Sequence, residues 1–246
     1  MTTRLVQISI KARDKSALGR FWAEALGWEV TGDGPDETNV EPGGIITYPS
    51  PEAVCIDVLT VPVPKTVKNR VHLDLATTSE DHQAELVARL QELGGTPVDV
   101  GQGDVPWTVL ADPEGNEFCV LEPREIYRDT GPVAAVVVDC ADPHTMARFW
   151  GEAMDWTVHE VTDDHARLRS AKAVGPYLEF IRTPDAKTGL NRVHFDVRPY
   201  PGDDQAAEAD RLRALGATDL DLGQGDVSWT VLTDPEDNEF CVLVPL

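Results

Sequence analysis

Two short segments place a histidine and a carboxylate where they could act together. The segment NRVHLD contains His72 and Asp74, and the segment NRVHFD repeats the pair as His194 and Asp196. Alternate residues of a strand point to the same face, so each histidine is expected beside its aspartate. Such a histidine could act as a general acid or base, with the aspartate orienting its ring. It could equally donate to the aspartate or to the backbone and hold the sheet together.

These segments belong to a duplication that extends over the chain. Residues 101–121 and 223–243 differ at only three of 21 positions, and the two NRVH segments lie 122 residues apart. Self-similarity of this kind indicates that one structural unit was copied, so any site is expected to occur as a pair. The second copy is six residues shorter, and the difference maps to the loop near residues 32–42.

Length and composition predict a globular protein of two domains. The chain has 246 residues, of which 41% are hydrophobic and 26% charged, and this is enough for two domains of about 120 residues. We expect residues 1–122 to form the first domain and residues 133–246 the second. Residues 123–132 are polar, bracketed by prolines and without periodicity, so they are predicted to be the linker.

Charge, hydropathy and cysteine usage limit the partners. A net charge of −22 argues against nucleic acid and anionic membranes; it indicates a solvated surface or an acidic cleft for a cationic ligand. There is no apolar run of about 18 residues, and the chain starts without a basic-then-apolar leader. The four cysteines form no C-x-x-C pair, which favours reduced, buried thiols in a cytoplasmic protein.

Hydrophobic periodicity predicts four β-α-β-β-β units. The first unit begins with a strand at residues 3–11, followed by a helix that Asp14 caps and Gly27 ends. Three short strands are expected next, near residues 28–31, 44–48 and 53–61. The second unit has a strand at 71–75, a helix from Ser79 or Glu80 to Gly94, and strands at 97–100, 107–111 and 117–121. The second half repeats this order, with a helix capped by Asp142, and a turn is expected in each DPE-x-N segment.

This arrangement resembles the vicinal oxygen chelate superfamily, the fold of glyoxalase I, extradiol dioxygenases and bleomycin-resistance proteins. The resemblance rests on the Phe-Trp helix, the NRVH-x-D strand and the D-P-E-x-N-E-F hairpin, all of which occur in both halves. It implies an α+β fold of two glyoxalase-like domains, whose strands curl into half-open barrels with the helices outside. The hairpin D-P-E-G-N-E-F-C is most similar to the glyoxalase-like branch.

The resemblance also implies where metal-using relatives would hold a cation. They use side chains of the first, fourth, fifth and eighth strands of a barrel, usually His or Gln, Glu, His and Glu. The corresponding residues here are Gln7 or Ala135, Asp57 or Glu179, His72 or His194, and Cys119 or Cys241. Because cysteine stands in both copies where the last glutamate is expected, we predict no metal cofactor, although zinc accepts Cys and His ligands.

Two tryptophans are candidate ligand contacts. Trp107 and Trp229 each begin a strand after a Gly-Gln-Gly-Asp loop, at the mouth where such barrels hold ligands. A large flat ring there would suit an aromatic or cationic guest. The alternative is a rim tryptophan that packs on its own loop.

Three classes of function are compatible with these residues. The first is a protein that binds or sequesters a small, cationic or aromatic metabolite without a metal, as in the bleomycin-resistance branch. The second is an enzyme of the superfamily, a lyase, isomerase or dioxygenase, and the third is an interaction module with vestigial clefts. The candidate ligand contacts are Gln7, Asp57, His72, Asp74, Trp107, Cys119, Glu179, His194, Asp196, Trp229 and Cys241.

The sequence leaves the assembly of the clefts open. If each cleft is built within one half, Gln7 and Asp57 would act with His72 and Cys119. If strands are exchanged between the halves, Gln7 would instead share a site with His194 and Cys241. The duplication is compatible with a monomer that carries its own pseudo-twofold, or with a homodimer.

Overall fold

The computed structural model describes residues 2–44 and 48–246, and the described residues form four β-α-β-β-β units, which confirms the α+β class. The first half of the chain contains β1 (Thr3–Ala12), α1 (Lys15–Leu26), β2 (Glu29–Asp33), β3 (Glu37–Glu41), β4 (Cys55–Thr60), β5 (Val71–Leu75), α2 (Glu80–Glu92), β6 (Thr96–Pro97), β7 (Thr108–Ala111) and β8 (Glu117–Val120). A 3₁₀ turn, η1 (Glu125–Tyr127), precedes the second half. That half contains β9 (Val133–Cys140), α3 (Pro143–Ala153), β10 (Trp156–Val161), β11 (His165–Ser170), β12 (Tyr177–Arg182), β13 (Val193–Pro199), α4 (Gln205–Leu215), β14 (Thr218–Asp219), β15 (Thr230–Thr233) and β16 (Glu239–Val242).

One strand lies at a different place from the one predicted. The strand expected at residues 44–48 falls largely on residues 45–47, which lie outside the described residues. The strand that pairs with both β2 and β4 is β3. Its sequence, ETNVE, has one apolar residue, Val40, which is fully buried together with Thr38. With a threonine taking an inward position, the alternation of apolar residues is too weak to indicate a strand.

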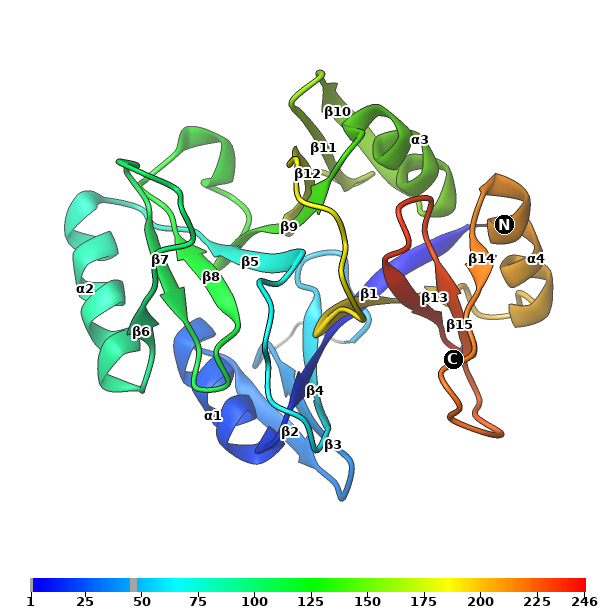
Figure 1. Ribbon diagram of the computed structural model, residues 1–246, viewed down its shortest axis with the longest axis horizontal. Coiled ribbons are helices and arrows are strands. Elements are labelled where there is room, and N and C mark those ends of the chain that lie inside the picture. Colours follow the sequence, from blue (N-terminus) through cyan, green and yellow to red (C-terminus); the bar gives the residue numbers. More distant parts are fainter. Residues whose placement is uncertain (1, 45–47) are drawn as a thin grey trace.

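The strands form two eight-stranded sheets, and each sheet takes four strands from each half of the chain (Figure 1). β1 pairs antiparallel with β13 in one sheet, and β5 pairs antiparallel with β9 in the other. Each sheet curves into a half-open barrel, as predicted. The first barrel combines β1–β4 with β13–β16, and the second barrel combines β5–β8 with β9–β12. Each cleft is therefore built across the two halves, which resolves the alternative that the sequence left open.

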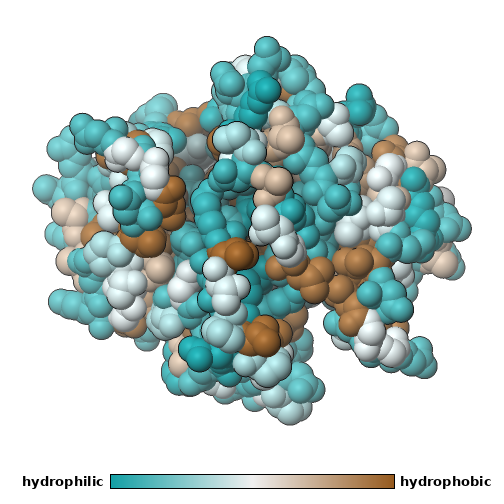
Figure 2. Space-filling view, in the orientation of Figure 1, coloured by the Kyte–Doolittle hydropathy of each residue, from teal (hydrophilic) through white to brown (hydrophobic). Residues whose placement is uncertain are grey.

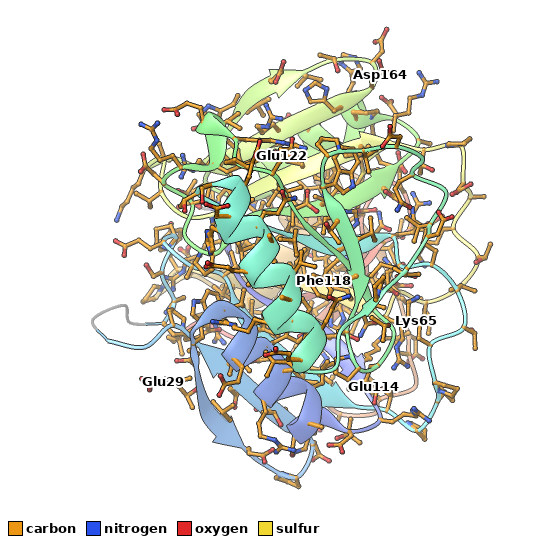
Figure 3. All side chains as sticks on the ribbon, turned by 90° about the vertical axis from the view of Figure 1, so that its left-hand side faces the viewer. Glu29, Lys65, Glu114, Phe118, Glu122 and Asp164 are labelled. Atoms are coloured by element: carbon orange, nitrogen blue, oxygen red, sulfur yellow. The ribbon has the colours of Figure 1, made fainter. Side chains whose placement is uncertain are left out.

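The helices lie outside the barrels and join the two units within each half. The side chain of Asp14 accepts from the Ala17 backbone N–H at the start of α1, and Gly27 ends the helix with a left-handed φ of 67°. In the first half α1 and α2 lie side by side (Figure 3). Trp22 of α1 packs edge-on against Phe118 of β8, with ring centroids 5.1 Å apart. The second half repeats this contact between Trp150 of α3 and Phe240 of β16, so in each half the first helix packs against the last strand.

The hairpin turns form as the DPE-x-N segments predict. The carboxylate of Asp112 accepts the backbone N–H groups of Glu114 and Asn116 at 2.9 Å. The indole N–H of Trp22 donates to the same carboxylate at 3.3 Å, which ties the turn to α1. Asp237, which replaces a glycine of the first copy, has a φ of 63°, and aspartate is among the residues that tolerate that conformation.

The repeated NRVH and DPE segments contact each other across the halves. Arg70 donates to the Asp139 backbone oxygen at 2.7 Å and reaches Glu236 of the opposite hairpin at 3.3 Å. Arg192 lies in the equivalent place, 3.6 Å from Glu114 of the first half's hairpin. Each arginine therefore joins its own half to the hairpin of the other half.

We predict that neither half folds as a stable monomer. Residues 1–127 alone would keep the pairs β1–β4 and β5–β8 but would leave the other edge of β1 and of β5 without β13 and β9. Unpaired strand edges associate readily. Analytical ultracentrifugation should show this fragment as dimers or aggregates. Co-expression with residues 128–246 should restore a 1:1 complex with the circular dichroism spectrum of the intact chain. A monomeric first fragment with a cooperative unfolding transition would contradict the prediction.

Candidate functional site

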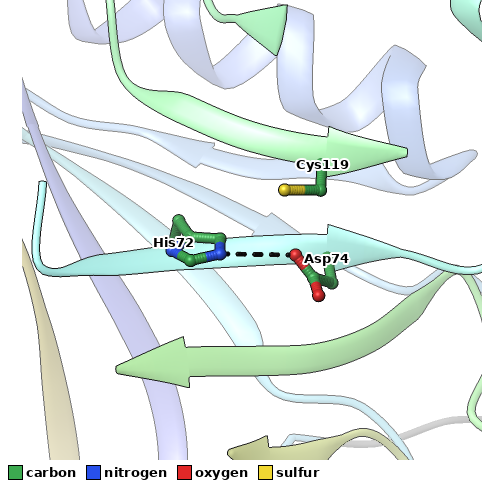
Figure 4. A group of neighbouring side chains, drawn as sticks. All are labelled: His72, Asp74 and Cys119. Carbon is green, nitrogen blue, oxygen red and sulfur yellow. Dashed lines mark ion pairs between the residues drawn. The ribbon is translucent and has the colours of Figure 1, made fainter. Parts of the chain in front are cut away.

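Each barrel places a histidine, an aspartate and a cysteine together on its inner face. In the second barrel His72 and Asp74 lie on β5 and Cys119 lies on the neighbouring strand β8, pointing toward them (Figure 4). In the first barrel His194 and Asp196 of β13 face Cys241 of β16. Within each group the nitrogen, oxygen and sulfur atoms all lie within 4.8 Å of one another. We call these the second and first triplets, after their barrels.

The floor of the first barrel is a closed network of polar side chains. The amide nitrogen of Gln7 donates to Asp57 at 2.5 Å and to Asp196 at 2.9 Å. Ser9 also donates to Asp196, at 2.7 Å, and Tyr48 donates to the Gln7 oxygen at 2.8 Å. The first, fourth and fifth strands thus converge, as the predicted ligand positions require. The adjoining cavity, which His194 and Trp229 line, has a volume of only about 140 Å³.

The first triplet is held in a low-charge state. Burial, with the nearby positive charge of Lys11, lowers the pKa of His194 to about 3. The pKa of Asp196 is raised to about 7, because burial and the charge of Asp57 together outweigh the hydrogen bonds from Ser9 and Gln7, which lower it. His194 is therefore a neutral imidazole at neutral pH.

The second barrel has an apolar interior and a larger cleft. Ala135 and Val137 stand where the first barrel has Gln7 and Ser9, so the polar network is absent among the described residues of this floor. The cleft has a volume of about 440 Å³, and its lining includes the second triplet and Glu179. The face of the molecule drawn in Figure 2 is mostly hydrophilic, with separate hydrophobic patches.

Glu179 of the second barrel is held by groups that the sequence did not single out. Tyr127 donates to the Glu179 carboxylate at 2.8 Å, and Arg167 donates to the same oxygen at 2.7 Å. Tyr127 belongs to the segment predicted as a linker. The sequence of that segment did not indicate a buried residue, because its hydrophobic residues do not recur at the period of a helix or a strand. Tyr127 is nevertheless buried, at 4% exposure, and packs edge-on against Tyr177. The segment between the halves therefore completes the second cleft.

The second triplet has the opposite electrostatic surroundings. Burial lowers the pKa of His72, but the hydrogen bond and charge of Asp74 and the charge of Asp139 outweigh it, so the pKa is raised above 6.5. Asp139 occupies the β9 position that Lys11 occupies in β1. A reversal of charge at this one position thus contributes to opposite shifts for the two histidines.

The two tryptophans occupy different surroundings. Trp107 lines the second cleft, and the guanidinium of Arg124 lies over its ring, 5.6 Å from the centroid. Trp229 lines the first cavity, and its indole nitrogen donates to Gln224 of its own loop at 3.3 Å. Both tryptophans therefore line a barrel cavity. Trp229 also contacts its own loop through Gln224, which was the alternative interpretation of these tryptophans.

The structure resolves one open alternative and corrects one prediction. Gln7 and Asp57 do not share a site with His72 and Cys119, because strand exchange places these pairs in different barrels. The prediction of no metal cofactor is wrong, because both triplets are groups that could hold a metal ion. The error came from considering only the four positions that metal-using relatives use, where cysteine replaces the last glutamate, and not counting Asp74 and Asp196 as metal ligands. Their place two residues beyond the histidine puts each carboxylate on the same inner face as the ring and the thiol.

The donors of each triplet fit zinc. Imidazole nitrogen, thiolate sulfur and carboxylate oxygen are the usual zinc ligands, and three protein ligands leave the fourth position open. One oxygen of Asp74, one oxygen of Asp196 and the Nδ1 atom of His194 are buried without a hydrogen-bond partner among the described residues. Buried polar atoms are rarely left unpaired, so these atoms are consistent with an additional ligand. Burial raises the pKa of both thiols, and a bound cation would deprotonate them.

The paired barrels of β-α-β-β-β units, each with a metal-capable group on its floor, define a member of the vicinal oxygen chelate superfamily with tandem duplication. The profile of the glyoxalase-like domain family matches residues 7–121 and again residues 135–243. The chain therefore belongs to the glyoxalase-like domain family.

Known proteins share the fold over nearly the whole chain. Glyoxalase I from Zea mays, as the V278E mutant, superposes with a TM-score of 0.64 at 17% identity, covering 99% of this chain and 92% of its own. A putative dioxygenase from Bacillus subtilis gives 0.63 at 14% identity, covering 99% and 85%. Glyoxalase 1 of Caenorhabditis elegans is 27% identical over 144 residues, which are 54% of this chain. This chain spans about half the length of that relative, at 48%.

None of the helices among the described residues is both long and apolar enough to cross a membrane. The longest is α2, with 13 residues, whereas about 20 apolar residues are needed to span the hydrocarbon core.

We predict that the two triplet histidines titrate far apart. In chelator-treated protein, ring ¹⁵N shifts should show that His72 protonates at a higher pH than an ordinary histidine, whereas His194 stays a neutral imidazole well below pH 6.5. Asp139→Asn should lower the pKa of His72, and Lys11→Met should raise that of His194, because each change removes the charge that contributes to the shift. Titration of both rings together near pH 6.5 would contradict the assigned environments.

Proposed function

We propose that the protein binds a small organic molecule in the cleft of the second barrel, against the second triplet. The observation that carries the proposal is the pairing of an open, largely apolar cleft of about 440 Å³ with polar groups on its floor. Ligand pockets commonly have this form, with a few polar groups that fix the orientation of the guest. The two cavities of the first barrel are each smaller, at about 140 Å³ beside His194 and Trp229 and about 280 Å³ beside Asp57 and Tyr48. Gln7 lines both of them and donates across the floor to Asp57 and Asp196.

Different residues of the second cleft would make different contacts with the ligand. Trp107 and Val137 offer apolar contact at the wall, where burial of apolar ligand surface is favourable. His72 can donate to an oxygen of the ligand, since its raised pKa favours the protonated ring. Glu179 is fixed by Tyr127 and Arg167, and so shapes the floor without moving.

The same triplet could hold a zinc ion through His72, Asp74 and Cys119. When bound, zinc acts as a Lewis acid that polarises an oxygen of the guest. In either case an oxygen of the ligand has a positive group to contact. Without zinc this group is the protonated ring of His72, and with zinc it is the ion.

A second candidate is an enzyme of the superfamily, a lyase, isomerase or dioxygenase. The observation that favours it is the first barrel, where Gln7, Asp57, His194 and Cys241 come from the four strands that carry ligands in metal-using relatives. The buried, unpartnered Nδ1 atom of His194 supports the same candidate. Metal-dependent turnover that is lost in His194→Asn and kept in His72→Asn would assign the chemistry to the first barrel.

We also propose a monomer located in the cytoplasm. The pairing of β1 with β13 and of β5 with β9 supplies within one chain the strand contacts that a dimer would otherwise make. All four cysteines are buried and unpaired, which suits a reducing compartment.

Ligand binding can be assigned to one barrel with matched tryptophan variants. We expect a fluorescence titration with small aromatic metabolites to change the emission of the wild type and of Trp229→Phe. The same titration should give a much smaller change in Trp107→Phe, because the reporting ring would then be missing from the second cleft. A response carried by Trp229 alone would move the site to the first barrel, and no response to a broad panel would contradict binding.

Zinc binding can be tested with matched cysteine variants. We expect reconstituted protein to hold up to two zinc ions per chain by plasma mass spectrometry after dialysis. Cys119→Ala and Cys241→Ala should each remove one of them, because two remaining donors bind zinc weakly. Circular dichroism should confirm that both variants fold. An unchanged zinc content in both would show that the triplets do not hold the metal.

A further inference from the structure

We propose that the ligand of the second cleft carries an anionic group, such as a carboxylate, which Arg182 binds at the mouth. This inference rests on the proposed function and specifies the class of molecule. It differs from the expectation of a cationic guest that the overall charge of −22 suggests.

Three of the carboxylates on the inner surface of the cleft are already bound within the protein. Asp139 accepts from Lys68 at 2.5 Å, Glu117 accepts from Lys65 at 2.5 Å, and Glu179 is bound by two donors. A cationic ligand would have to displace an internal partner of these three groups, at a cost in free energy. Asp74 differs, because one of its oxygens has no hydrogen-bond partner among the described residues, but it lies on the floor beside His72 and not at the rim.

Arg182, at the end of β12, is differently placed. Among the described residues that line this cleft, Arg182 and Asp185 are the charged side chains without an ion pair. Both are exposed at the rim. A guanidinium offers a rigid fork of donors that matches the two oxygens of a carboxylate. Lys68 and Arg124 lie in the same lining as Arg182, but they are paired with Asp139 and Glu122, so Arg182 is the cation whose side chain is left for a ligand.

The duplication provides an internal comparison for these charges. The positions 122 residues away from Lys68, Arg124 and Arg182 are Leu190, Leu246 and Thr60, all without a side-chain charge. Asp185 corresponds to Val63, and Asp139, which replaces Lys11, has its charge balanced by Lys68. The second cleft thus has three cations that the first lacks, and the arginine among them that faces solvent is unpaired.

The cleft has room for an organic anion with an apolar body. Its 440 Å³ continue into a groove of about 370 Å³ between the loops around residues 67–70 and 185–192, and the two share Lys68, Asn69, Asp139 and Asp185 in their lining. An apolar body can lie against Trp107 and Ile181 while its charged group meets Arg182.

The test uses three probes of one shape and different charge: benzoate, benzamide and benzylamine. Titration of the full chain, followed by ¹H–¹⁵N shifts, should show benzoate binding most tightly. Arg182→Thr, which copies the first barrel, should weaken benzoate by at least about tenfold and leave benzamide unchanged, since a charge-assisted hydrogen bond is lost. Arg20→Thr, an exposed arginine outside the cavities, is the charge-matched control and should bind benzoate like the wild type.

The outcomes separate this inference from the proposed function. Tighter binding of benzylamine than of benzoate, or equal loss of benzoate in Arg182→Thr and Arg20→Thr, would overturn the anionic ligand and leave small-molecule binding intact. Unchanged benzoate affinity in Arg182→Thr would do the same. If none of the three probes shifts any resonance of the second barrel, the proposed function itself fails.

Discussion

The pairing of strands between the two halves is the constraint on which the rest of the structure depends. β1 with β13 and β5 with β9 form the centres of the two sheets, so each barrel exists only when both halves are present. The helices add contacts within each half, because Trp22 packs against Phe118 and Trp150 packs against Phe240. Strand pairing between the halves and these helix contacts within each half therefore join the two barrels to one another.

Strand exchange also explains how two nearly identical sequences produce two different sites. Each cleft combines the first four strands of one copy with the last four strands of the other, β1–β4 with β13–β16 and β9–β12 with β5–β8. A substitution at one position therefore alters only one barrel. The fifth and eighth strands are almost unchanged, and they give both barrels the same His-Asp-Cys triplet. The first strands differ, with Gln7 and Lys11 in one and Ala135 and Asp139 in the other. One barrel is thereby closed by polar groups, and the other stays open and apolar.

Most of the fold could be predicted from the sequence because its signals are local. The caps at Asp14 and Asp142, the glycine at the end of α1 and the turn at Asp112 depend on residues a few positions apart. β3 was missed because Thr38 occupies a buried position where the pattern requires an apolar residue. The site was predictable only in part. Each triplet residue could be named, but the choice of barrel for Gln7 depends on strand pairing 189 residues apart in sequence, which no local pattern records.

The residues that were missed share one property, namely that they act through groups on other elements. Tyr127 and Arg167 fix Glu179, whereas Lys11 and Asp139 shift the two histidines in opposite directions. None of them belongs to a motif, and their effect arises from burial and proximity in the folded chain. Comparison of the two copies is the signal that could have found Lys11 and Asp139, because a change of charge inside otherwise repeated strands is visible in the sequence. In a duplicated protein the differences between copies are therefore as informative about function as the repeated motifs.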